Sequence, residues 1–405
     1  MPYIGKTPTA VPLTSSDITD GIITSAKISD GTIATADISD SAVTKAKTSG
    51  VVSDPFRNII INGDMSIAQR GTSATGLTNG NNGYHTIDRY RFSELSAPSF
   101  AFTQSQSTTV PSGQGFSTSL KMDCTTAQGS LGAGDGLRIQ QRLEGQNLQY
   151  LKKGTSSAQS LTLSFWVRSA KTGTYIAELF DNDNTRYISQ SYTISSADTW
   201  EKKTLTYAGD TSGTLGNDNA ESLTLNFWLA SGTTYTSGTL GTSWHTTGAN
   251  RAVGQVNLAD STSNDWYVTG VQLEAGTSAS DFEFLPHEVN FQRCQRYFFK
   301  LIDVPSGDSS DYFCSGFYYS GGTFYAWIDF PTMMRTAPTL SVASGSNYYI
   351  IYRNGGADNV DDFDLSIGRT NGGLIRNNTD ASGTGGHGGG VHSTSNSKIT
   401  FTAEL

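Results

Sequence analysis

The sequence predicts an all-β protein with a fibrous N-terminal segment followed by two β-sandwiches. Its 405 residues include 44 glycines, and only 16% are Asp, Glu, Lys or Arg, a turn-rich composition typical of β proteins. Branched apolar residues recur at every fifth position near the N-terminus. In several later segments apolar and polar residues alternate, which is the pattern of strands with one buried face.

The five-residue repeat occupies residues 17–46, and its apolar positions are Ile18, Ile23, Ile28, Ile33, Ile38 and Val43. This period fits neither an α-helix nor a β-strand. One chain cannot cover so narrow a stripe, whereas three intertwined chains can turn it inward, so we expect a trimeric stalk over residues 17–50. A disordered linker is the alternative that low hydrophobicity favours. Linkers, however, do not hold an apolar residue in one register six times.

Residues 51–286 carry the alternating pattern and predict a jelly-roll β-sandwich. The segments LTLSFWV at 161–167 and LTLNFWL at 223–229 are near copies. Each has apolar residues on one face and a tryptophan on the other. The other expected strands are TYIAELF, RYISQSYTI, WEKKTLTYA and DWYVTGVQLE, with polar loops between them.

Residues 287–405 predict a short connecting helix and a second, smaller sandwich. HEVNFQRCQRYFFKLI has near-helical spacing of Val289, Cys294, Tyr297, Phe298 and Leu301. The strands expected after it are rich in Tyr, Phe and Ile, a composition that suits a sandwich packed against copies of itself. The glycine-rich stretch 377–397 has almost no core-forming residue, so we expect a surface loop there.

Several segments share one resemblance: RNIIINGDMSIAQRG, YHTIDRYRF, LTLSFWVRSAKTGTY, DTWEKKTLTY and WYVTGVQLEAGTSASDFEFLPHEVNFQRCQRYF. They look like a domain common in bacteriophage tail fibres, which is itself similar to the jelly rolls of carbohydrate-binding modules. MPYIGKTP with the repeat resembles the N-termini of tail fibres from marine phages. FPTMMRTAPTLSV is similar to a segment that follows the CQRY helix in the same proteins.

The resemblance implies a homotrimeric fibre or adhesin of the virion, assembled in the host cytoplasm. Residues 1–16 would dock on other tail or baseplate proteins, and the two β-rich modules would attach to a bacterial surface, with a polysaccharide as the expected receptor. Three copies would let weak sites hold a cell. Two alternatives stay open: a tailspike enzyme that cleaves capsule or lipopolysaccharide, and a structural component such as a head fibre or tail connector.

Two groups of residues are candidate receptor sites. Trp166, Trp228, Arg168 and Asn226 would share one face if their strands share a sheet, and sugar rings stack on indoles while Arg and Asn bond their hydroxyls. A covering loop or a trimer interface would equally explain the tryptophans. The second group is the distal tip loop, whose glycines let a backbone approach a partner closely. Its residues are Gly385, Gly386, His387, Gly388, Gly389, Gly390 and His392.

Metal binding is a weaker hypothesis. On a threefold axis, His387 and His392 could surround a transition metal with six imidazoles, although solvent-exposed loop histidines are the simpler explanation. Asn62 and Asp64 match positions where such jelly rolls hold structural calcium. ELFDNDN resembles the start of a calcium loop but lacks its Gly and its twelfth-position Glu. Ordinary turns are the default for both segments, so calcium is the only cofactor kept as a candidate.

Composition and motifs argue against other functions. A net charge of −9 without a basic stripe argues against nucleic-acid binding, and no apolar run is long enough to insert into a membrane. Cys124, Cys294 and Cys314 form no CxxC motif, which indicates buried free thiols. Zincin, P-loop and GxSxG signatures are absent, so we expect no enzyme. A carboxylate pair for glycan hydrolysis has no fixed spacing, which keeps the tailspike alternative open.

Overall fold

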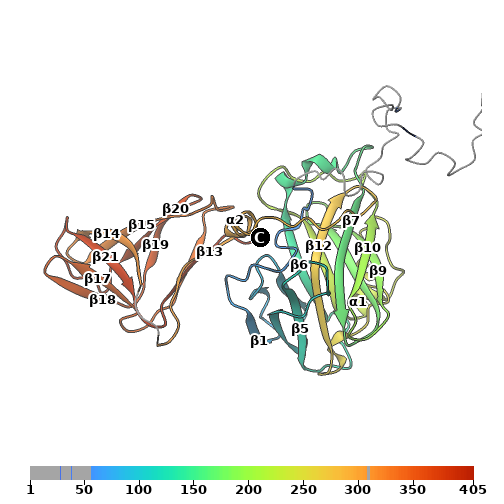
Figure 1. The fold of residues 1–405 in the computed structure, drawn as a ribbon, viewed down its shortest axis with the longest axis horizontal. Helices are drawn as coiled ribbons and strands as arrows, with labels where there is room; N and C mark the ends of the chain where they lie inside the picture. Colours follow the sequence, from blue (N-terminus) through green and yellow to red (C-terminus); the bar gives the residue numbers. More distant parts are fainter. Residues whose placement is uncertain (1–27, 29–37, 39–55, 308–310) are drawn as a thin grey trace, which may run out of the picture. The chain divides into compact units, whose positions relative to one another are not determined.

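The computed structural model describes residues 28, 38, 56–307 and 311–405. The described residues from 56 onward belong to one compact unit built from four antiparallel sheets (Figure 1). The all-β class and the sandwich architecture are therefore confirmed. The expected stalk lies outside the described residues, apart from Ile28 and Ile38, which are both exposed. No helix among the described residues has the length and apolar character needed to cross a membrane.

The first sandwich consists of two six-stranded sheets. Sheet A has the order β1-β4-β5-β12-β7-β10, and sheet B has the order β2-β3-β6-β11-β8-β9. The strands of sheet A are β1 (Ser73–Leu77), β4 (Ala101–Ser107), β5 (Ser119–Thr126), β7 (Leu161–Ser169), β10 (Glu201–Tyr207) and β12 (Asp265–Ala275). Those of sheet B are β2 (Gly83–Tyr84), β3 (Arg91–Leu95), β6 (Gly136–Glu144), β8 (Gly173–Asp181), β9 (Arg186–Ile194) and β11 (Glu221–Ser231). The chain passes repeatedly between the two sheets, as in a jelly roll.

Short helices occupy the connections. They are η5 (Gly145–Asn147), η6 (Gln149–Leu151), α1 (Thr233–Thr236), η7 (Gly248–Asn250), η8 (Leu258–Asp260) and α2 (His287–Gln295). The segment between β11 and β12 contains α1, η7 and η8. Helix α2 follows the last strand of the first sandwich.

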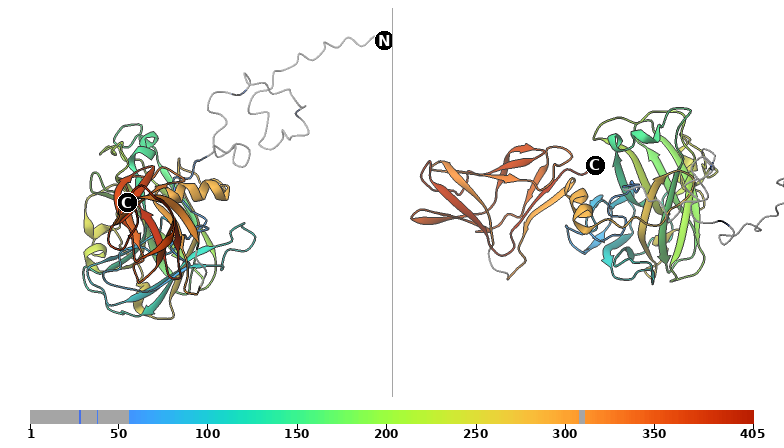
Figure 2. Two further views of the ribbon diagram at one scale, coloured as in Figure 1. Left: turned by 90° about the vertical axis from the view of Figure 1, so that its left-hand side faces the viewer. Right: turned by 45° about the horizontal axis from the view of Figure 1, so that its top comes forward.

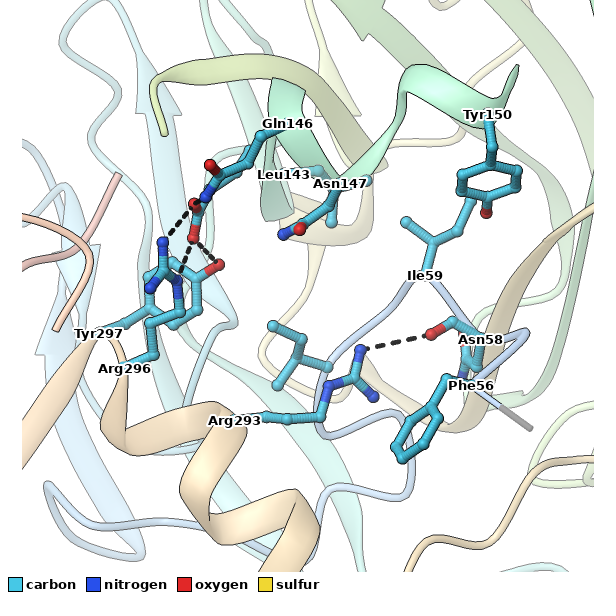
Figure 3. A pocket seen from close by; sticks show the side chains of 12 residues that line it. Phe56, Asn58, Ile59, Leu143, Gln146, Asn147, Tyr150, Arg293, Arg296 and Tyr297 are labelled. Carbon is cyan, nitrogen blue, oxygen red and sulfur yellow. Dashed lines mark hydrogen bonds and ion pairs between the residues drawn. The ribbon is translucent and has the colours of Figure 1, made fainter. Parts of the chain in front are cut away.

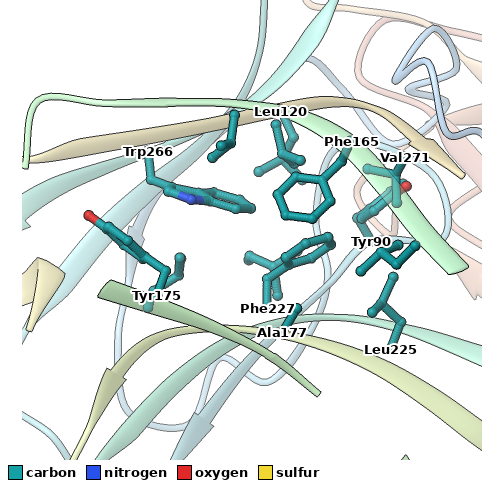
Figure 4. Packing of buried hydrophobic residues seen from close by; sticks show 14 of the residues in the cluster. Tyr90, Leu120, Phe165, Tyr175, Ala177, Leu225, Phe227, Trp266 and Val271 are labelled. Atoms are coloured by element: carbon teal, nitrogen blue, oxygen red, sulfur yellow. The ribbon is translucent and has the colours of Figure 1, made fainter. Parts of the chain in front are cut away.

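The core of the first sandwich lies between sheets A and B. The apolar faces predicted for 161–167 and 223–229 are confirmed, because Leu163, Phe165, Leu225 and Phe227 are at most 1% exposed. Phe165 of sheet A meets Phe227 of sheet B edge-on, with ring centroids 5.0 Å apart (Figure 4). Phe227 also lies 5.6 Å from the ring of Trp266. Such aromatic pairs contribute about 0.5–1.5 kcal/mol beyond the burial of area.

The C-terminal strands form two further sheets, orange to red in Figure 2. Sheet C has the order β13-β22-β16, and sheet D has the order β18-β17-β21-β14-β15-β20-β19. The strands of sheet C are β13 (Phe298–Asp303), β16 (Thr339–Val342) and β22 (Lys398–Thr402). Those of sheet D are β14 (Tyr312–Ser320), β15 (Thr323–Asp329), β17 (Tyr349–Arg353), β18 (Gly356–Val360), β19 (Asp364–Arg369), β20 (Gly372–Asn377) and β21 (Gly388–Ser393). Buried side chains of both sheets share one hydrophobic cluster, separate from that of the first sandwich.

The expected connecting helix is shorter than its apolar spacing suggests. Val289 and Cys294 lie in α2, whereas Phe298 and Leu301 lie in strand β13. Strand β13 pairs with β22, and this long-range pairing overrides the local helical spacing.

The expected surface loop at 377–397 is wrong in its second half, because Gly388–Ser393 is strand β21 in the interior of sheet D. Strand β21 pairs with β14 on one side and with β17 on the other. Val391 is fully buried in the core. A Cβ atom at Gly389 would lie only 2.9 Å from Cγ2 of Ile351. Glycine is therefore present in this strand because large neighbouring side chains occupy the space beside it.

Candidate functional site

Sheet D presents large exposed side chains on the face turned away from its core. Side chains alternate along a strand, so the neighbours of buried residues such as Tyr318, Phe324 and Ile351 point outward. We call the following residues the aromatic face: Tyr312, Phe317, Tyr319, Trp327 and Tyr352, which are 39–71% exposed. Exposed apolar patches of this kind mark interaction sites.

A shallow hollow of about 470 Å³ lies on this face, above strand β21. Its lining residues are Tyr312, Ser315, Gly316, Tyr352, Arg353, Asn354, Gly388, Gly389 and Gly390. At Gly388 an added Cβ atom would meet nothing closer than the backbone oxygen of Gly316, at 3.8 Å. The hollow therefore exists because the floor strand lacks side chains at this place.

The tyrosines beside the hollow are held by His392. The ring of His392 lies edge-on to Tyr312 at 5.2 Å and to Tyr352 at 4.8 Å, with interplanar angles of 68° and 81°. His392 comes from β21, whereas the two tyrosines come from the strands on either side of it. Three adjacent strands therefore fix the two phenol rings relative to each other.

Arg353 lines the same hollow and is anchored from below. Its Nε and Nη2 atoms donate to the carboxylate of Asp358 at 3.3 and 3.1 Å, and Nη2 also donates to the carbonyl of Ser382 at 2.7 Å. The hydrogen bond to Asp358 raises the pKa of Arg353. Burial alone would raise the pKa of Asp358, but hydrogen bonds from Arg353 and Tyr318 outweigh it and hold that pKa below its ordinary value. The Arg353–Asp358 ion pair has no net charge, so Arg353 offers the hollow a fixed guanidinium and not an excess positive charge.

This combination of groups suits a polyhydroxylated ligand. Flat aromatic rings offer apolar contact area with a polar hydroxyl at the edge, which matches the C–H faces of a sugar ring. Arg353 offers N–H donors only, whereas Asn354 and Ser315 can both donate and accept hydrogen bonds. Because none of the described residues lining the hollow carries a carboxyl group, the hollow has no acid–base pair of the kind that glycosidases use.

The structure brings together only part of the predicted tip group. Gly388, Gly389 and Gly390 line the hollow, and His392 orients its tyrosines. The backbone carbonyl of His387 accepts from the amide of Tyr318 at 2.9 Å, in the approach to β21. Gly385 and Gly386 form the preceding turn. The predicted group therefore lies beside a site, although as part of a sheet and not as a loop.

The two tryptophans do not share a face, which corrects the first predicted group. Trp166 lies on β7 in sheet A, whereas Trp228 lies on β11 in sheet B. Trp228 is fully buried. It packs against Ile176 and Ala252, and its ring lies 5.2 Å from Tyr235. The segment between β11 and β12 supplies Tyr235 and Ala252, so a covering loop accounts for this indole.

Trp166 and Arg168 are half-buried on the outer face of sheet A. Arg168 donates to the carboxylate of Asp198 at 2.7 Å, and its guanidinium lies 4.8 Å from the ring centre of Tyr267. Asn226, by contrast, is buried in sheet B. The four residues expected on one face therefore belong to two separate environments.

The polar side chains on the outer face of sheet B bond one another and a residue of the covering segment. Hydrogen bonds of 2.6–3.0 Å link Arg91, Gln140, Asn226, Glu178 and Arg251 in that order. Arg251 comes from the covering segment between β11 and β12. Burial alone would lower the pKa of Arg251, but the ion pair with Glu178 outweighs it and raises the pKa. Asn226 thus serves an internal network.

The residues considered for calcium make protein hydrogen bonds instead. The side-chain Nδ2 of Asn62 donates to the backbone carbonyls of Ile67 and Asp88, at 2.9 and 3.0 Å. Asp64 accepts from the side chain of Asn290 at 3.1 Å. Over the described ranges, no group of three or more His, Cys, Asp or Glu residues could hold a metal ion, so calcium at Asn62 and Asp64 stays a prediction without a site. Cys124, Cys294 and Cys314 are buried free thiols, as predicted.

Sequence reasoning missed most of the side chains that line the hollow. Tyr312, Tyr352 and Arg353 lie in expected strands, but nothing local distinguishes an outward tyrosine from an inward one. The useful signal would have been the alternation in NYYIIYR. There the buried Tyr349 and Ile351 place Tyr352 on the opposite face.

No family model and no curated protein sequence match this chain. Among solved structures, it is similar to the enzymatically active domain of tailspike protein 4 from bacteriophage CBA120, with 14% identity over 55% of this chain and 22% of that chain and a TM-score of 0.31. The family 11 carbohydrate-binding module from Clostridium thermocellum has 10% identity over 52% of this chain and 99% of that chain, with a TM-score of 0.26. The N-terminal cellulose-binding domain of a Cellulomonas fimi β-1,4-glucanase has 14% identity over 53% of this chain and 100% of that chain, with a TM-score of 0.22. The chain thus spans less than a quarter of the tailspike domain's length.

Proposed function

We propose that this chain is a phage fibre adhesin that binds a glycan of the bacterial surface through the hollow on the aromatic face. The observation that carries the proposal is the glycine-floored hollow between Tyr312 and Tyr352, beside the anchored Arg353. The sequence resemblance to tail fibres supports the setting. In it, the chain is a homotrimer of the virion whose residues 1–16 dock on tail or baseplate proteins and whose residues 17–50 form the stalk.

The proposed activity is noncovalent binding. A shallow hollow bounded by aromatic rings, and without a carboxyl group among its lining residues, favours recognition over hydrolysis. Binding at each copy can be weak, because three linked copies raise the overall affinity through avidity.

The test is binding of the full-length chain to an array of bacterial surface polysaccharides. Replacing Tyr312 and Tyr352 by alanine should lower binding at least about tenfold, because each ring supplies apolar contact in addition to its hydroxyl. Met333→Ala is the matched control, since Met333 is a large exposed side chain, 62% exposed, outside sheet D. Binding of the double variant at the parent level would reject the hollow as the glycan site.

Two measurements separate the alternatives. Release of reducing ends from a bound polysaccharide would indicate a tailspike enzyme, whereas the proposal expects none. Light scattering should give three times 43.3 kDa for the parent and for the double variant. If the double variant instead falls apart into single chains, the aromatic face is an interface between copies.

A further inference from the structure

A second pocket lies at the end of the first sandwich, and none of its lining residues belongs to sheet D (Figure 3). Its volume is about 520 Å³, in the range of small-molecule sites. Three segments form it: residues 56–61, the end of β6 with the turns η5 and η6, and helix α2. The residues that carry the argument are Phe56, Asn147, Tyr150, Arg293 and the pair Glu144–Arg296.

One wall of this pocket is formed by an ion pair whose charges cancel. Glu144 is fully buried and accepts from Nε and Nη2 of Arg296, both at 2.7 Å. It also accepts from the hydroxyl of Tyr297 at 2.5 Å and from the amide of Gln146 at 2.6 Å. Burial alone would raise the pKa of Glu144, but the hydrogen bonds from Arg296 and Tyr297 outweigh it and lower that pKa. The Glu144–Arg296 pair therefore offers a ligand no net charge.

Arg293 forms no ion pair with a carboxylate of the described residues, although Glu283 lies near enough to act on it electrostatically. Among the described residues, its side chain makes one hydrogen bond, from Nη2 to the carbonyl oxygen of Asn58 at 3.4 Å. In the part of the chain that the structure describes, no carboxylate forms an ion pair with Arg293, and the nearby Glu283 accepts from the backbone amides of Phe56 and Asn58 instead. Burial lowers the pKa of Arg293, but a guanidinium stays protonated in proteins.

Most of the five N–H donors of Arg293 are therefore uncommitted. A partly buried charge without a partner is unfavourable, and an anion in the pocket would remove that cost. A guanidinium matches a carboxylate in particular, because two parallel N–H groups can meet its two oxygens.

The rest of the pocket supplies neutral groups. Asn147 points into the pocket in Figure 3, and no hydrogen bond to another described residue occupies its amide. Tyr150 and Phe56 lie on the side opposite Arg296 and are 51% and 63% exposed. The pocket thus combines one cation, one free amide and two accessible ring faces, which a carboxylate-bearing sugar ring would use together.

We infer that this pocket binds a saccharide of the hexuronic-acid class. Its carboxylate would lie on Arg293, its hydroxyls on Asn147, and one ring face on Tyr150. This site is separate from the hollow on the aromatic face, and either can fail without the other.

Calorimetric titration of the full-length chain tests the inference. The probes are sodium D-galacturonate and sodium D-glucuronate, with D-galactose, D-glucose and sodium acetate for comparison. At least one uronate should bind about tenfold or more tightly than its neutral counterpart and than acetate, because the site uses a charge-assisted contact and a ring contact together. Arg293→Met should lower uronate affinity at least about tenfold, whereas Arg369→Met, which removes an exposed arginine on β19, should not.

Several outcomes would overturn the inference. Acetate that binds as tightly as the uronates would leave only a general anion site, and neutral sugars that bind as tightly would show that the charge is unused. If uronate binding does not saturate at concentrations of several tens of millimolar, the site is rejected. If Arg293→Met has a lower melting temperature than the parent, its lost binding could reflect unfolding. Tyr150→Ala is then the test of the site: it must weaken uronate binding and leave acetate binding unchanged. The Tyr312 and Tyr352 double variant must titrate with uronate like the parent, which separates this site from the proposed function.

Discussion

Asp358 anchors Arg353 across a hairpin, with Nε to Oδ2 at 3.3 Å and Nη2 to Oδ1 at 3.1 Å. The two residues come from the paired strands β17 and β18. Asp358 also accepts from the hydroxyl of the buried Tyr318 at 2.5 Å. A nearly buried carboxylate thereby ties the core of the second sandwich to the half-buried guanidinium of the candidate glycan site.

Asp358→Asn should release Arg353 and weaken glycan binding several-fold, because Asn can present only one acceptor oxygen. The chain should still unfold cooperatively. The pKa of Asp358 is lower in the folded chain than its ordinary value. The contribution of its ionised carboxylate to stability is therefore complete above the ordinary pKa and is lost only as the pH falls through the lower, folded-state pKa. Glycan binding by the parent should therefore stay level between about pH 5 and 8. Asp361→Asn, an exposed residue beyond the same hairpin, is the control, and equal binding by both variants would contradict the anchoring role.

Gly388→Val should close the hollow without harming the fold. The new Cβ would meet only the backbone oxygen of Gly316, at 3.8 Å, and valine suits a strand better than glycine. We therefore expect unchanged stability or a gain of up to about 1 kcal/mol, with glycan binding lowered at least about tenfold. Gly129→Val is matched to it, because an added Cβ there meets no atom within 4 Å and is likewise free of close contacts. Normal array binding by Gly388→Val would mean that the glycan does not reach the floor of the hollow.

Glu404→Gln should destabilise the chain by about 3–5 kcal/mol, since it leaves a buried charge without its partner. Glu404 forms ion pairs with Arg89, which is fully buried, and with Arg70 at 3.0 Å. Urea denaturation measures the loss. The control is Asp364→Asn, which removes a 65% exposed partner of Arg376 and should cost at most about 1 kcal/mol. Equal unfolding midpoints for the two variants would show that the Glu404 pair contributes little.

Asp88 should give the stability a pH dependence. Burial raises its pKa from the ordinary 3.8 to about 6, against the opposing effects of Arg70 and of hydrogen bonds from Gln69. Because the folded-state pKa is the higher one, the stabilisation is complete below the ordinary value and is lost as pH rises through about 6. A difference of this size corresponds to about 3 kcal/mol. Urea titrations from pH 4 to 7 should show the free energy of unfolding of Asp88→Asn rising relative to that of the parent. A difference between the two that does not change with pH would refute the raised pKa of Asp88.

The strands that could be predicted from the sequence are those with a clean period of two. RYISQSYTI coincides with β9, and LTLSFWV and LTLNFWL lie within β7 and β11. Strand β6 was missed, because Gln141 lies between Ile139 and Leu143 on its inward face, where it hydrogen-bonds the backbone of Ile61. Gln140 there belongs to the polar network of sheet B. A polar residue on the inward face breaks the apolar half of the alternation by which a strand is recognised.

The candidate site could be located only roughly. Local sequence fixes which side of a strand a residue occupies, but long-range pairing decides which strands share a sheet. Strand β7 pairs with β10 and β12, whereas β11 pairs with β6 and β8, so two near-identical segments came to lie in opposite sheets. The glycines of β21 predict a loop when only local sequence is considered, because their packing partners, such as Ile351, are distant in sequence.

The two tryptophans should therefore respond differently to removal. Trp228→Ala should cost about 3–5 kcal/mol, as for a large aromatic side chain in a well-packed core, because Trp228 is fully buried among Ile176, Ala252 and Tyr235. Trp166→Ala should cost about 1 kcal/mol or less, because Trp166 is half-buried on the outer face of sheet A. Chemical denaturation of the single variants measures both losses.

Glycan binding by Trp166→Ala then decides whether sheet A takes part in recognition. Under the proposed function this variant binds the polysaccharide array like the parent, while the Tyr312 and Tyr352 double variant does not. The comparison is informative because Trp166 lies in sheet A and is not among the residues that line the hollow, and its variant is expected to fold normally. If Trp166→Ala loses binding while keeping its unfolding midpoint, the outer face of sheet A contacts the glycan. In that case Arg168, which lies on the same strand face two residues along, becomes the next residue to replace.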